Sequence, residues 1–260
     1  MQSLLNRKIV LVSGGTQGVG AAVARAAVRE GGTVVVTGRR REPGEQLVAE
    51  LIGKGGGTAR YVQADVGDVA QARAAVAAAV AEFGRVDCLV NAAGLTSRGT
   101  LLDTTPELFD AHVAVNLRGP YFTMQAVVAD MVRRGEPGTV VNILSTSELG
   151  GQPYLSPYVA AKAGLAGATR NAAHAHRWDR IRINGLDIGW TDSAGEDATQ
   201  RAFHGAGDDW REKAAASLPM GKLSQVDEIA DFVVFLLSDR SGVVTGSVID
   251  WDQSVVGAYD

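Results

Sequence analysis

The sequence predicts an α/β fold, a doubly wound parallel sheet of about seven strands with helices on both of its faces. Short apolar, β-branched runs alternate along the chain with longer segments of helical pattern. Turn-forming clusters rich in glycine, at 31–32, 55–57 and 136–138, separate these elements. Strand–helix alternation with apolar strands implies a parallel sheet covered on both sides, and right-handed crossovers then give the doubly wound arrangement.

Each element follows from a local pattern. Strands are expected at Ile9–Val12, Thr33–Thr37, Arg60–Val62, Asp87–Asn91, Thr139–Leu144, Ile181–Leu186 and near Ser247–Ile249. Helices are expected at Val19–Arg29, Glu45–Ile52, Val69–Phe83, Pro106–Asn116 running on to Arg134, Pro157–Arg177 and Val226–Leu237. The stretch 191–218 is the least regular. Because it follows the end of a strand, we expect it to form a substrate-binding lid.

Size and composition limit the class of protein. The 260 residues, 46% of them hydrophobic, suit a single domain spanning 1–260. A net charge of −4 and a pI near 5.6 argue against a nucleic-acid surface or a polybasic membrane patch. With Cys88 as the only cysteine, no intrachain disulfide is possible. The N-terminus lacks the pattern of a signal peptide, and the aliphatic and aromatic run Phe232–Leu237 is too short to span a bilayer, so we expect a cytoplasmic protein.

A glycine-rich loop follows the first expected strand and opens the first helix. Its sequence, from Ser13 to Gly20, carries Gly14, Thr16, Gly18, Val19 and Gly20. Glycine permits a tight turn and a close approach of backbone to a pyrophosphate, and the helix N-terminus offers free N–H groups to phosphates. A glycine cluster by itself is also found in ordinary strand–helix turns. The strand–loop–helix context favours nucleotide binding here.

The end of the second strand bears on the choice of nucleotide. NAD-specific sites usually have an acidic residue there to accept hydrogen bonds from the ribose 2′-OH. This chain has Arg39, Arg40 and Arg41 instead, with no carboxylate before Glu42. A guanidinium can pair with a 2′-phosphate, and Arg39 is the best placed, so NADP is favoured over NAD. The alternative is a solvated basic turn at the start of a helix.

Tyr158 and Lys162 lie four residues apart in an expected helix, with Ser145 upstream. This spacing puts the phenol and the ammonium on one helix face. A nearby ammonium should lower the pKa of the tyrosine, which can then exchange a proton with an alcohol or carbonyl oxygen. The same spacing alone often means a buried ring beside a solvated lysine. Together with the nucleotide loop, it indicates a hydride-transfer enzyme.

These residues together resemble the short-chain dehydrogenase/reductase family, in its compact, single-domain, Rossmann-type branch. The resemblance covers the chain from about Asn6 to about Asp252, with the motifs in the order of the family. The matching positions are Gly14, Gly18 and Gly20 of the glycine motif, Asp65 and Val66 at the adenine, the turn Asn91-Ala92-Ala93-Gly94, and the tetrad Asn116, Ser145, Tyr158 and Lys162.

The resemblance implies a role for each tetrad residue. Tyr158 would be the general acid and base at the substrate oxygen, which Ser145 would hold by a hydrogen bond. Lys162 would bind the nicotinamide ribose and lower the tyrosine pKa, and Asn116 would hold a water that links Lys162 to solvent. Gly189, Thr191 and Ser193 are expected at the nicotinamide amide. No metal is needed, and His174 and His176 point to different helix faces.

The chain departs from the family pattern at two places. Where the family usually has Pro-Gly after the sixth strand, this chain has Ile188-Gly189, preceded by the unusual Asp187. At the C-terminus, Asp250-Trp251-Asp252-Gln253 replaces an Asp-Gly-Gly turn. The loss of two glycines suggests a more rigid tail, which could reach a substrate pocket. The alternative for Trp251 is packing in the core. Small residues along 157–177 suit helix pairing between subunits, and the family suggests a homotetramer or dimer.

The expected lid points to a polar substrate. It carries Glu196, Asp197, Arg201, Phe203, His204, Asp208, Asp209 and Trp210. Many charges and few aliphatic side chains suit a sugar, polyol or cyclic alcohol, with Trp190 and Trp210 available to stack on a ring. The alternatives are a reductase of a less polar ketone or 3-oxoacyl substrate, and a cofactor-binding sensor without turnover. An enoyl reductase is disfavoured because that branch has a longer tyrosine-to-lysine spacing.

Overall fold

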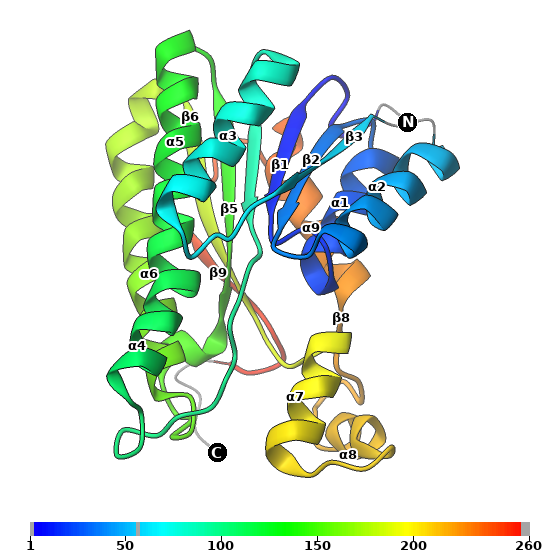
Figure 1. The fold of residues 1–260 in the computed structure, drawn as a ribbon, viewed down its shortest axis with the longest axis vertical. Helices are drawn as coiled ribbons and strands as arrows, with labels where there is room; N and C mark the ends of the chain where they lie inside the picture. The colour runs from blue at the N-terminus through cyan, green and yellow to red at the C-terminus, as the bar shows by residue number, and fades with distance from the viewer. Residues whose placement is uncertain (1–2, 56–57, 256–260) are drawn as a thin grey trace.

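The computed structural model describes residues 3–55 and 58–255. Seven strands form one sheet in the order β3-β2-β1-β4-β5-β6-β9 (Figure 1). Every neighbouring pair in it is parallel. The strands are β1 (Ile9–Ser13), β2 (Thr33–Gly38), β3 (Ala59–Gln63), β4 (Cys88–Asn91), β5 (Gly138–Ser145), β6 (Ile181–Ile188) and β9 (Val248–Trp251). The predicted fold class is therefore confirmed. The strand order reverses between β1 and β4, which is where open sheets of this kind bind ligands.

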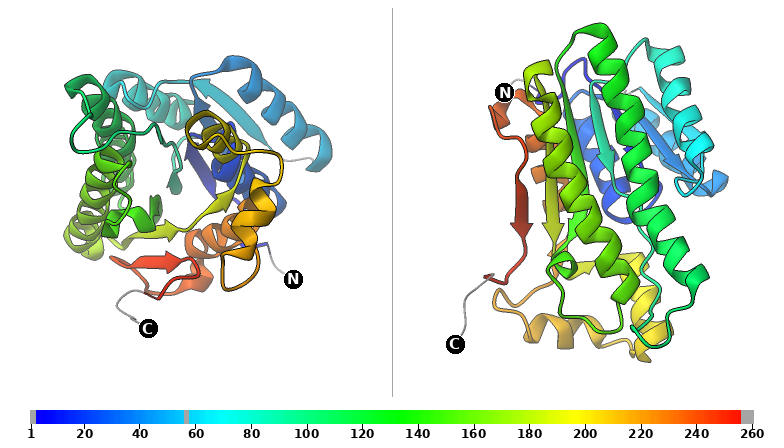
Figure 2. Two further views of the ribbon diagram at one scale, coloured as in Figure 1. Left: turned by 90° about the horizontal axis from the view of Figure 1, so that it is seen from below. Right: turned by 90° about the vertical axis from the view of Figure 1, so that its left-hand side faces the viewer.

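Helices cover both faces of the sheet (Figure 2). One face is packed by α1 (Gly18–Arg29), α2 (Arg41–Gly55) and α9 (Val226–Leu237), and the other by α3 (Val69–Phe83), α5 (Gly119–Arg134) and α6 (Ser156–His176). The bounds of α3 match the prediction, because Asp68 accepts hydrogen bonds from the first-turn N–H groups and Gly84, with φ of 80°, ends the helix.

The single helix expected over 106–134 is interrupted. The chain forms α4 (Pro106–Val113), a π-helical turn η1 (Ala114–Arg118) and then α5. A Cβ atom on Gly119 would lie 2.2 Å from the carbonyl oxygen of Val66, so only glycine allows the helix to approach that loop so closely. The wider π turn buries Asn116 completely, and such turns often occur at functional sites.

The stretch 191–218, expected to be irregular, contains two helices. It holds β7 (Thr191–Asp192), α7 (Ala194–His204) and α8 (Trp210–Ala216), and β7 pairs with β8 (Ser224–Gln225) further on. Ser193 caps α7 by accepting a hydrogen bond from the N–H of Glu196. Figure 1 shows both helices beyond the carboxyl ends of the strands, as a lid requires.

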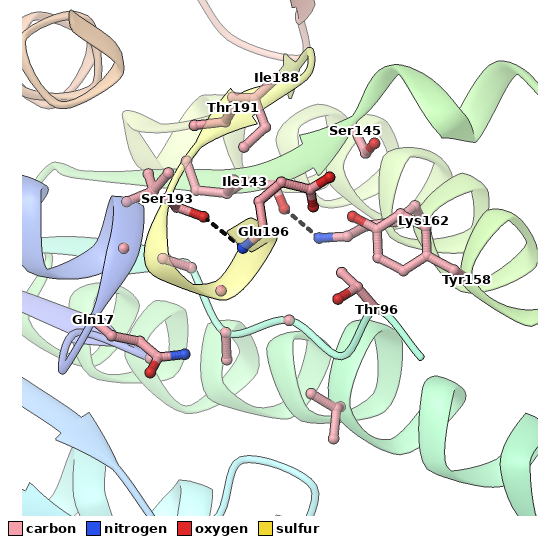
Figure 3. A pocket seen from close by; sticks show the side chains of 18 of the residues that line it. Gln17, Thr96, Ile143, Ser145, Tyr158, Lys162, Ile188, Thr191, Ser193 and Glu196 are labelled. Atoms are coloured by element: carbon pink, nitrogen blue, oxygen red, sulfur yellow. Dashed lines mark hydrogen bonds between the residues drawn. The ribbon is translucent and has the colours of Figure 1, made fainter. Parts of the chain in front are cut away.

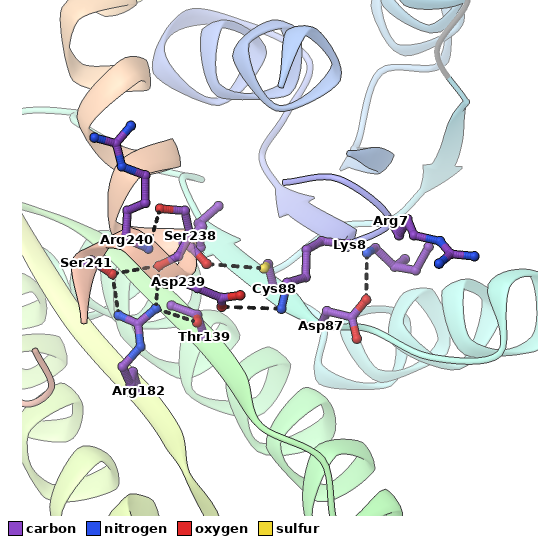
Figure 4. Close-up of polar contacts among 12 residues, drawn as sticks. Arg7, Lys8, Asp87, Cys88, Thr139, Arg182, Ser238, Asp239, Arg240 and Ser241 are labelled. Carbon is purple, nitrogen blue, oxygen red and sulfur yellow. Dashed lines mark hydrogen bonds and ion pairs between the residues drawn. The ribbon is translucent and has the colours of Figure 1, made fainter. Parts of the chain in front are cut away.

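A polar network lies at the opposite, amino end of the sheet (Figure 4). Arg182 of β6 donates hydrogen bonds to the carbonyl oxygens of Leu236 and Ser238 and to the hydroxyls of Thr139 and Ser241, at 2.7–3.1 Å. These contacts join β5 and β6 to the end of α9. Cys88 lies beside them, and burial raises the pKa of its thiol to about 12. The thiol is therefore protonated and serves packing. No helix in the described ranges is long and apolar enough to cross a membrane.

Candidate active site

A cavity of about 920 Å³ opens at the carboxyl ends of the strands, between the loops that follow them and α7. It runs from the glycine-rich loop to Tyr158. Most of the predicted site residues line it: Gly14, Thr16, Gly18, Val19, Arg39, Arg40, Asp65, Val66, Ala92, Ala93, Gly94, Ser145, Tyr158, Lys162, Gly189, Thr191 and Ser193. Gly20, Asn91 and Asn116 lie outside its lining.

The glycine-rich loop requires glycine for reasons of close packing. Gly14 has φ of 77°, and a Cβ atom there would lie 2.4 Å from the backbone nitrogen of Ala93. A Cβ atom on Gly20 would lie 2.2 Å from the carbonyl oxygen of Gly14. Helix α1 begins at Gly18 and no side chain caps its N-terminus. Gly18 and Val19 of its first turn line the cavity, an arrangement that fits a nucleotide phosphate.

The three arginines after β2 differ in their contacts. Arg40 donates a hydrogen bond to the side chain of Gln17 in the glycine-rich loop, and Arg41 pairs with Glu45 on its own helix. The guanidinium of Arg39 has no hydrogen-bond or ion-pair partner within the described parts of the chain, although it lines the cavity. Arg39 is thus the exposed cation that remains available to a bound anion.

Asp65, predicted at the adenine, and Asn91, predicted in the turn 91–94, make different contacts. The Asp65 carboxylate accepts a hydrogen bond of 2.9 Å from the N–H of Gly67 and lies at the cavity wall. The Asn91 side chain is turned into the protein, where it donates to Asn142 at 2.8 Å and to the carbonyl oxygen of Pro120. Asn91 therefore joins β4 to β5 and α5, and its side chain does not face the cavity.

The side chains of Ser145, Tyr158 and Lys162 meet at the far end of the cavity (Figure 3). Ser145 ends β5, and the other two lie on the buried face of α6. The Lys162 ammonium donates a hydrogen bond of 2.7 Å to the carbonyl oxygen of Ile143 and lies 5.6 Å from the centre of the Tyr158 ring. Both side chains are almost fully buried.

The expected lowering of the tyrosine pKa by Lys162 is not found. Burial raises the pKa of Tyr158 to about 12, and its hydrogen bond with Ser145 opposes that rise. Glu196 and Asp187 raise the pKa further through their negative charge, whereas Arg98 lowers it. Burial also lowers the pKa of Lys162 to about 8, so the lysine releases its proton more readily than a free lysine but stays mainly protonated at pH 7. Desolvation outweighs the attraction that the spacing suggested.

Asn116 is bonded to the loop after β4 and to a histidine that sequence reasoning missed. Its side chain accepts from the N–H of Leu95 at 2.9 Å and donates to the carbonyl oxygen of Leu95 at 3.0 Å. It lies 3.2 Å from Nδ1 of the fully buried His112, whose Nε2 is 3.0–3.1 Å from the hydroxyl and carbonyl oxygens of Ser97. With Nδ1 as acceptor, Nε2 carries the proton.

His112 thus holds Asn116 and the 95–98 loop together beside the reactive tyrosine. Its ring lies edge-on to that of Tyr158, with the centroids 6.2 Å apart. Its position one helical turn before Asn116 was the available signal.

The wall of the cavity around Tyr158 is polar and comes from three separate segments. Glu196 of α7 points toward Tyr158, and one of its oxygens accepts hydrogen bonds from Trp190 and Gln200, both of 2.8 Å (Figure 3). On another side, Arg98 lies 5.2 Å from the centre of the Tyr154 ring and 3.1–3.3 Å from Nε2 of His204. The lining residues in this part that the sequence did not suggest are Thr96, Arg98, Ser147, Gln152, Tyr154 and Gln200.

Most of the predicted lid charges do not face the cavity. Asp197 accepts hydrogen bonds from Arg201, Trp210 and Arg211, which join α7 to α8. Of the eight lid residues named from the sequence, Glu196 and His204 line the cavity. Trp210 is buried and stacks on Trp190 with ring centroids 6.2 Å apart. Trp190 alone of the two indoles is exposed to a ligand in the cavity.

The C-terminal segment packs against the body and the lid. Trp251 stacks on Phe232 of α9, with the centroids 4.6 Å apart, as expected for core packing. The Gln253 side chain accepts from the N–H of Met220 at 2.8 Å and donates to the carbonyl oxygen of Lys222 at 2.7 Å. It therefore braces the chain after α8, and residues 251–255 do not line the cavity.

Sequence comparisons identify similar proteins over almost the whole chain. A family model described as enoyl-(acyl carrier protein) reductase matches residues 14–254. L-rhamnose 1-dehydrogenase (NAD(P)(+)) of Azotobacter vinelandii is 36% identical over 249 residues, covering 94% of each chain. A 3-oxoacyl-[acyl-carrier-protein] reductase of Thermotoga maritima is 33% identical, covering 97% of this chain and 99% of the relative.

A solved structure gives the same result for the fold. A protein of Sinorhizobium meliloti described as a short-chain alcohol dehydrogenase superimposes with a TM-score of 0.88 at 31% sequence identity. The match covers 97% of this chain and 98% of that one.

The environment of His112 predicts an acid-sensitive stability. Burial lowers the pKa of His112 below its ordinary 6.5, so the folded protein favours the neutral ring. The stabilisation is therefore present above pH 6.5, the ordinary pKa that applies to the unfolded chain. It is lost as the pH falls through the lower pKa of His112 in the folded protein. We expect His112→Gln to lower the free energy of unfolding by about 1 kcal/mol at high pH. The difference in free energy of unfolding between the variant and the wild type, measured by urea titration, should shrink as the pH falls. The exposed His174→Gln is the control, and a difference independent of pH would contradict this account.

Proposed function

The chain belongs to the short-chain dehydrogenase/reductase family and is an NAD(P)-dependent oxidoreductase acting on CH–OH groups, and we propose that its substrate is a sugar, a polyol or a related cyclic alcohol. The single observation that carries this substrate class is the wall that faces Tyr158. Within reach of one small space it offers a carboxylate, a guanidinium, an imidazole and two carboxamides, on Glu196, Arg98, His204, Gln152 and Gln200.

Such a wall needs polar groups on the ligand. One oxygen of Glu196 already accepts two hydrogen bonds, and the other remains to accept one from a hydroxyl. The Arg98 guanidinium has more N–H groups than its contacts with His204 and Thr96 use. A fatty chain would cover these groups without pairing them, at a cost of about 1–3 kcal/mol for each. A polyhydroxylated ring pairs with donors and acceptors together.

For the chemistry, we assign each residue of the tetrad a separate task. A bound nicotinamide supplies the hydride acceptor or donor. Tyr158 exchanges the proton at the substrate oxygen, and Ser145 holds that oxygen by a hydrogen bond. Lys162, charged on a buried helix face, binds the nicotinamide ribose. Asn116 stays a candidate for the proton relay. Its side-chain bonds to Leu95 and His112 favour a role in fixing the 95–98 loop as well.

The relatives support two substrate classes. Two similar proteins named L-rhamnose 1-dehydrogenase, at 36% and 34% identity, favour a sugar. The 33% identical 3-oxoacyl-[acyl-carrier-protein] reductase makes an acyl thioester the second candidate. The description of the family model names an enoyl reductase. The four-residue step from Tyr158 to Lys162 favours reduction at a carbonyl instead.

We also propose that the chain self-associates through α6, as a homotetramer or a dimer. A Cβ atom on Gly167 would meet no other atom within 4 Å, so the helix backbone is open there to a second helix. Ala160 and Ala168 add further small side chains to the same helix. A monomer in light scattering at micromolar concentration would contradict this proposal.

The substrate class is tested by a panel of sugars, polyols, cyclic alcohols, steroidal ketones and 3-oxoacyl thioesters, each with NADP and NAD. The readout is the gain or loss of reduced nicotinamide. We expect turnover on the hydroxylated compounds, and Tyr158→Phe should lower it at least 100-fold while leaving cofactor affinity nearly unchanged. Better turnover of steroidal or acyl substrates would overturn the sugar class. Cofactor binding without any turnover would favour a sensor.

The cofactor preference is tested at Arg39. Because its guanidinium is unpartnered at the cavity, Arg39→Ala should raise the KM for NADP by about 10- to 100-fold, equivalent to one charge-assisted contact. The KM for NAD should change little. Arg41→Ala is the matched control, since Arg41 pairs with Glu45 and does not line the cavity. Equal effects of Arg39→Ala on both cofactors would assign the 2′-phosphate to another group.

A further inference from the structure

Asp187 is a carboxyl group in an apolar position. It lies in β6, beside Leu144 of β5 and Asp250 of β9 in the sheet register, and no part of it is exposed. No hydrogen-bond donor from residues 3–55 or 58–255 is bonded to either carboxyl oxygen. An ionised carboxylate buried in this way is costly, because it is an acceptor that needs donors or a positive partner.

Two polar groups approach the Asp187 carboxyl: the backbone N–H of Ser145 and a second acid, Glu148. Glu148 lies in the short turn η2 (Thr146–Leu149) directly after Ser145, and its side chain is only 6% exposed. Its one cationic neighbour, Arg170 of α6, is 3.7 Å away. Two carboxylates cannot donate to each other, so a hydrogen bond between these groups exists only when one of them carries a proton.

This pair of acids lies behind the reactive side chains. The groups that face Asp187 are Glu148 from η2, the backbone N–H of Ser145, and Asp250 from β9. On α6, both Tyr158 and Lys162 are close enough to feel its charge. Ser145 is therefore bounded by Tyr158 on the cavity side and by Asp187 on the protein side.

We propose that Asp187 and Glu148 share one proton and act as a positioning pair, which keeps a single negative charge behind Ser145, Tyr158 and Lys162. Two negative charges there would repel each other in a site that excludes water. With no negative charge there, the buried Lys162 ammonium would lack a counter-charge on this side. The consequences for turnover rest on the proposed function. The shared proton does not.

The titration of these groups agrees with the arrangement. Burial first, and then the charge of Glu148, raise the pKa of Asp187 to about 7. A charged Asp187 raises the pKa of Lys162, against the effect of burial, and it also raises the pKa of Tyr158. Removing both carboxyl groups by mutation therefore moves both reactive groups toward lower pKa values.

The shared proton is tested by infrared spectroscopy on the full-length wild type, near pH 6, where ordinary aspartate and glutamate side chains are ionised. We expect the C=O stretch of a protonated carboxylic acid in the wild type. It should be lost in Asp187→Asn and also in Glu148→Gln, because either change removes one half of the pair. Absence of the band in the wild type, or its persistence in both variants, would overturn the proposal.

The positioning role is tested by the pH dependence of kcat/KM for alcohol oxidation. The double variant Asp187→Asn/Glu148→Gln should shift the whole profile to lower pH by about one unit, because the single negative charge of the pair is lost, whereas in Asp187→Asn alone Glu148 still carries that charge. Asp239→Asn, an 88% exposed aspartate at the other end of the sheet, is the control and should leave the profile unchanged. A loss of rate with an unshifted profile would reduce Asp187 to a structural role.

The two measurements separate this proposal from the proposed function. If no substrate on the panel is turned over but the infrared band behaves as expected, the substrate proposal fails and the shared proton stands. If turnover is found and the band is absent, the substrate proposal stands and the shared proton is ruled out.

Discussion

The site depends on how α6 is held against the end of β5. The Lys162 ammonium reaches under the Tyr158 ring and bonds to the carbonyl oxygen of Ile143 at 2.7 Å, two residues before Ser145. That one contact fixes the helix face to the strand end where the serine lies. It is possible because β4 ends opposite Asn142, so Ile143 of the central strand β5 has no β4 partner at the cavity. The parallel register of β5 with β4 and β6 then brings the other loops to the same rim.

Burial, rather than pairing, sets the charges in this site. Tyr158, Lys162, His112 and Asp187 are all held away from water, and for each of them the largest influence on the pKa is desolvation. In every case burial favours the neutral form. The fixed charges of Glu196 and Arg98 then act on Tyr158 in opposite directions. Burial thus brings the pKa values of Lys162 and Asp187 closer to neutral pH, to about 8 and about 7, and keeps Tyr158 in its protonated form.

The sequence predicted well what depends on local pattern and poorly what depends on tertiary contact. The seven strands and the limits of α3 followed from periodicity and capping, and motif order placed most of the predicted site residues at the cavity. Helix α7 was missed although Ser193 and Glu196 form a recognisable capping pattern. His112 had only its position one turn before Asn116 as a signal and Glu148 had none, because their contacts are with residues far along the chain, Ser97 and Asp187. Lysine spacing gave the wrong direction for the tyrosine pKa, since spacing contains no information about desolvation.

The contacts of the charged residues in 191–218 explain why composition alone identified mostly the wrong polar side chains for the pocket. Asp197, Arg201 and Arg211 neutralise one another on the outer side of α7 and stabilise the lid itself. The polarity that a ligand meets comes instead from a few side chains on three segments: the loop after β4, the turn after β5 and the inner face of α7. Relatives named for a sugar and for an acyl thioester share most of the chain length with this protein. These three segments are the part of the scaffold that presents polar groups to the cavity, and Arg98, Gln152 and Glu196 contribute one each.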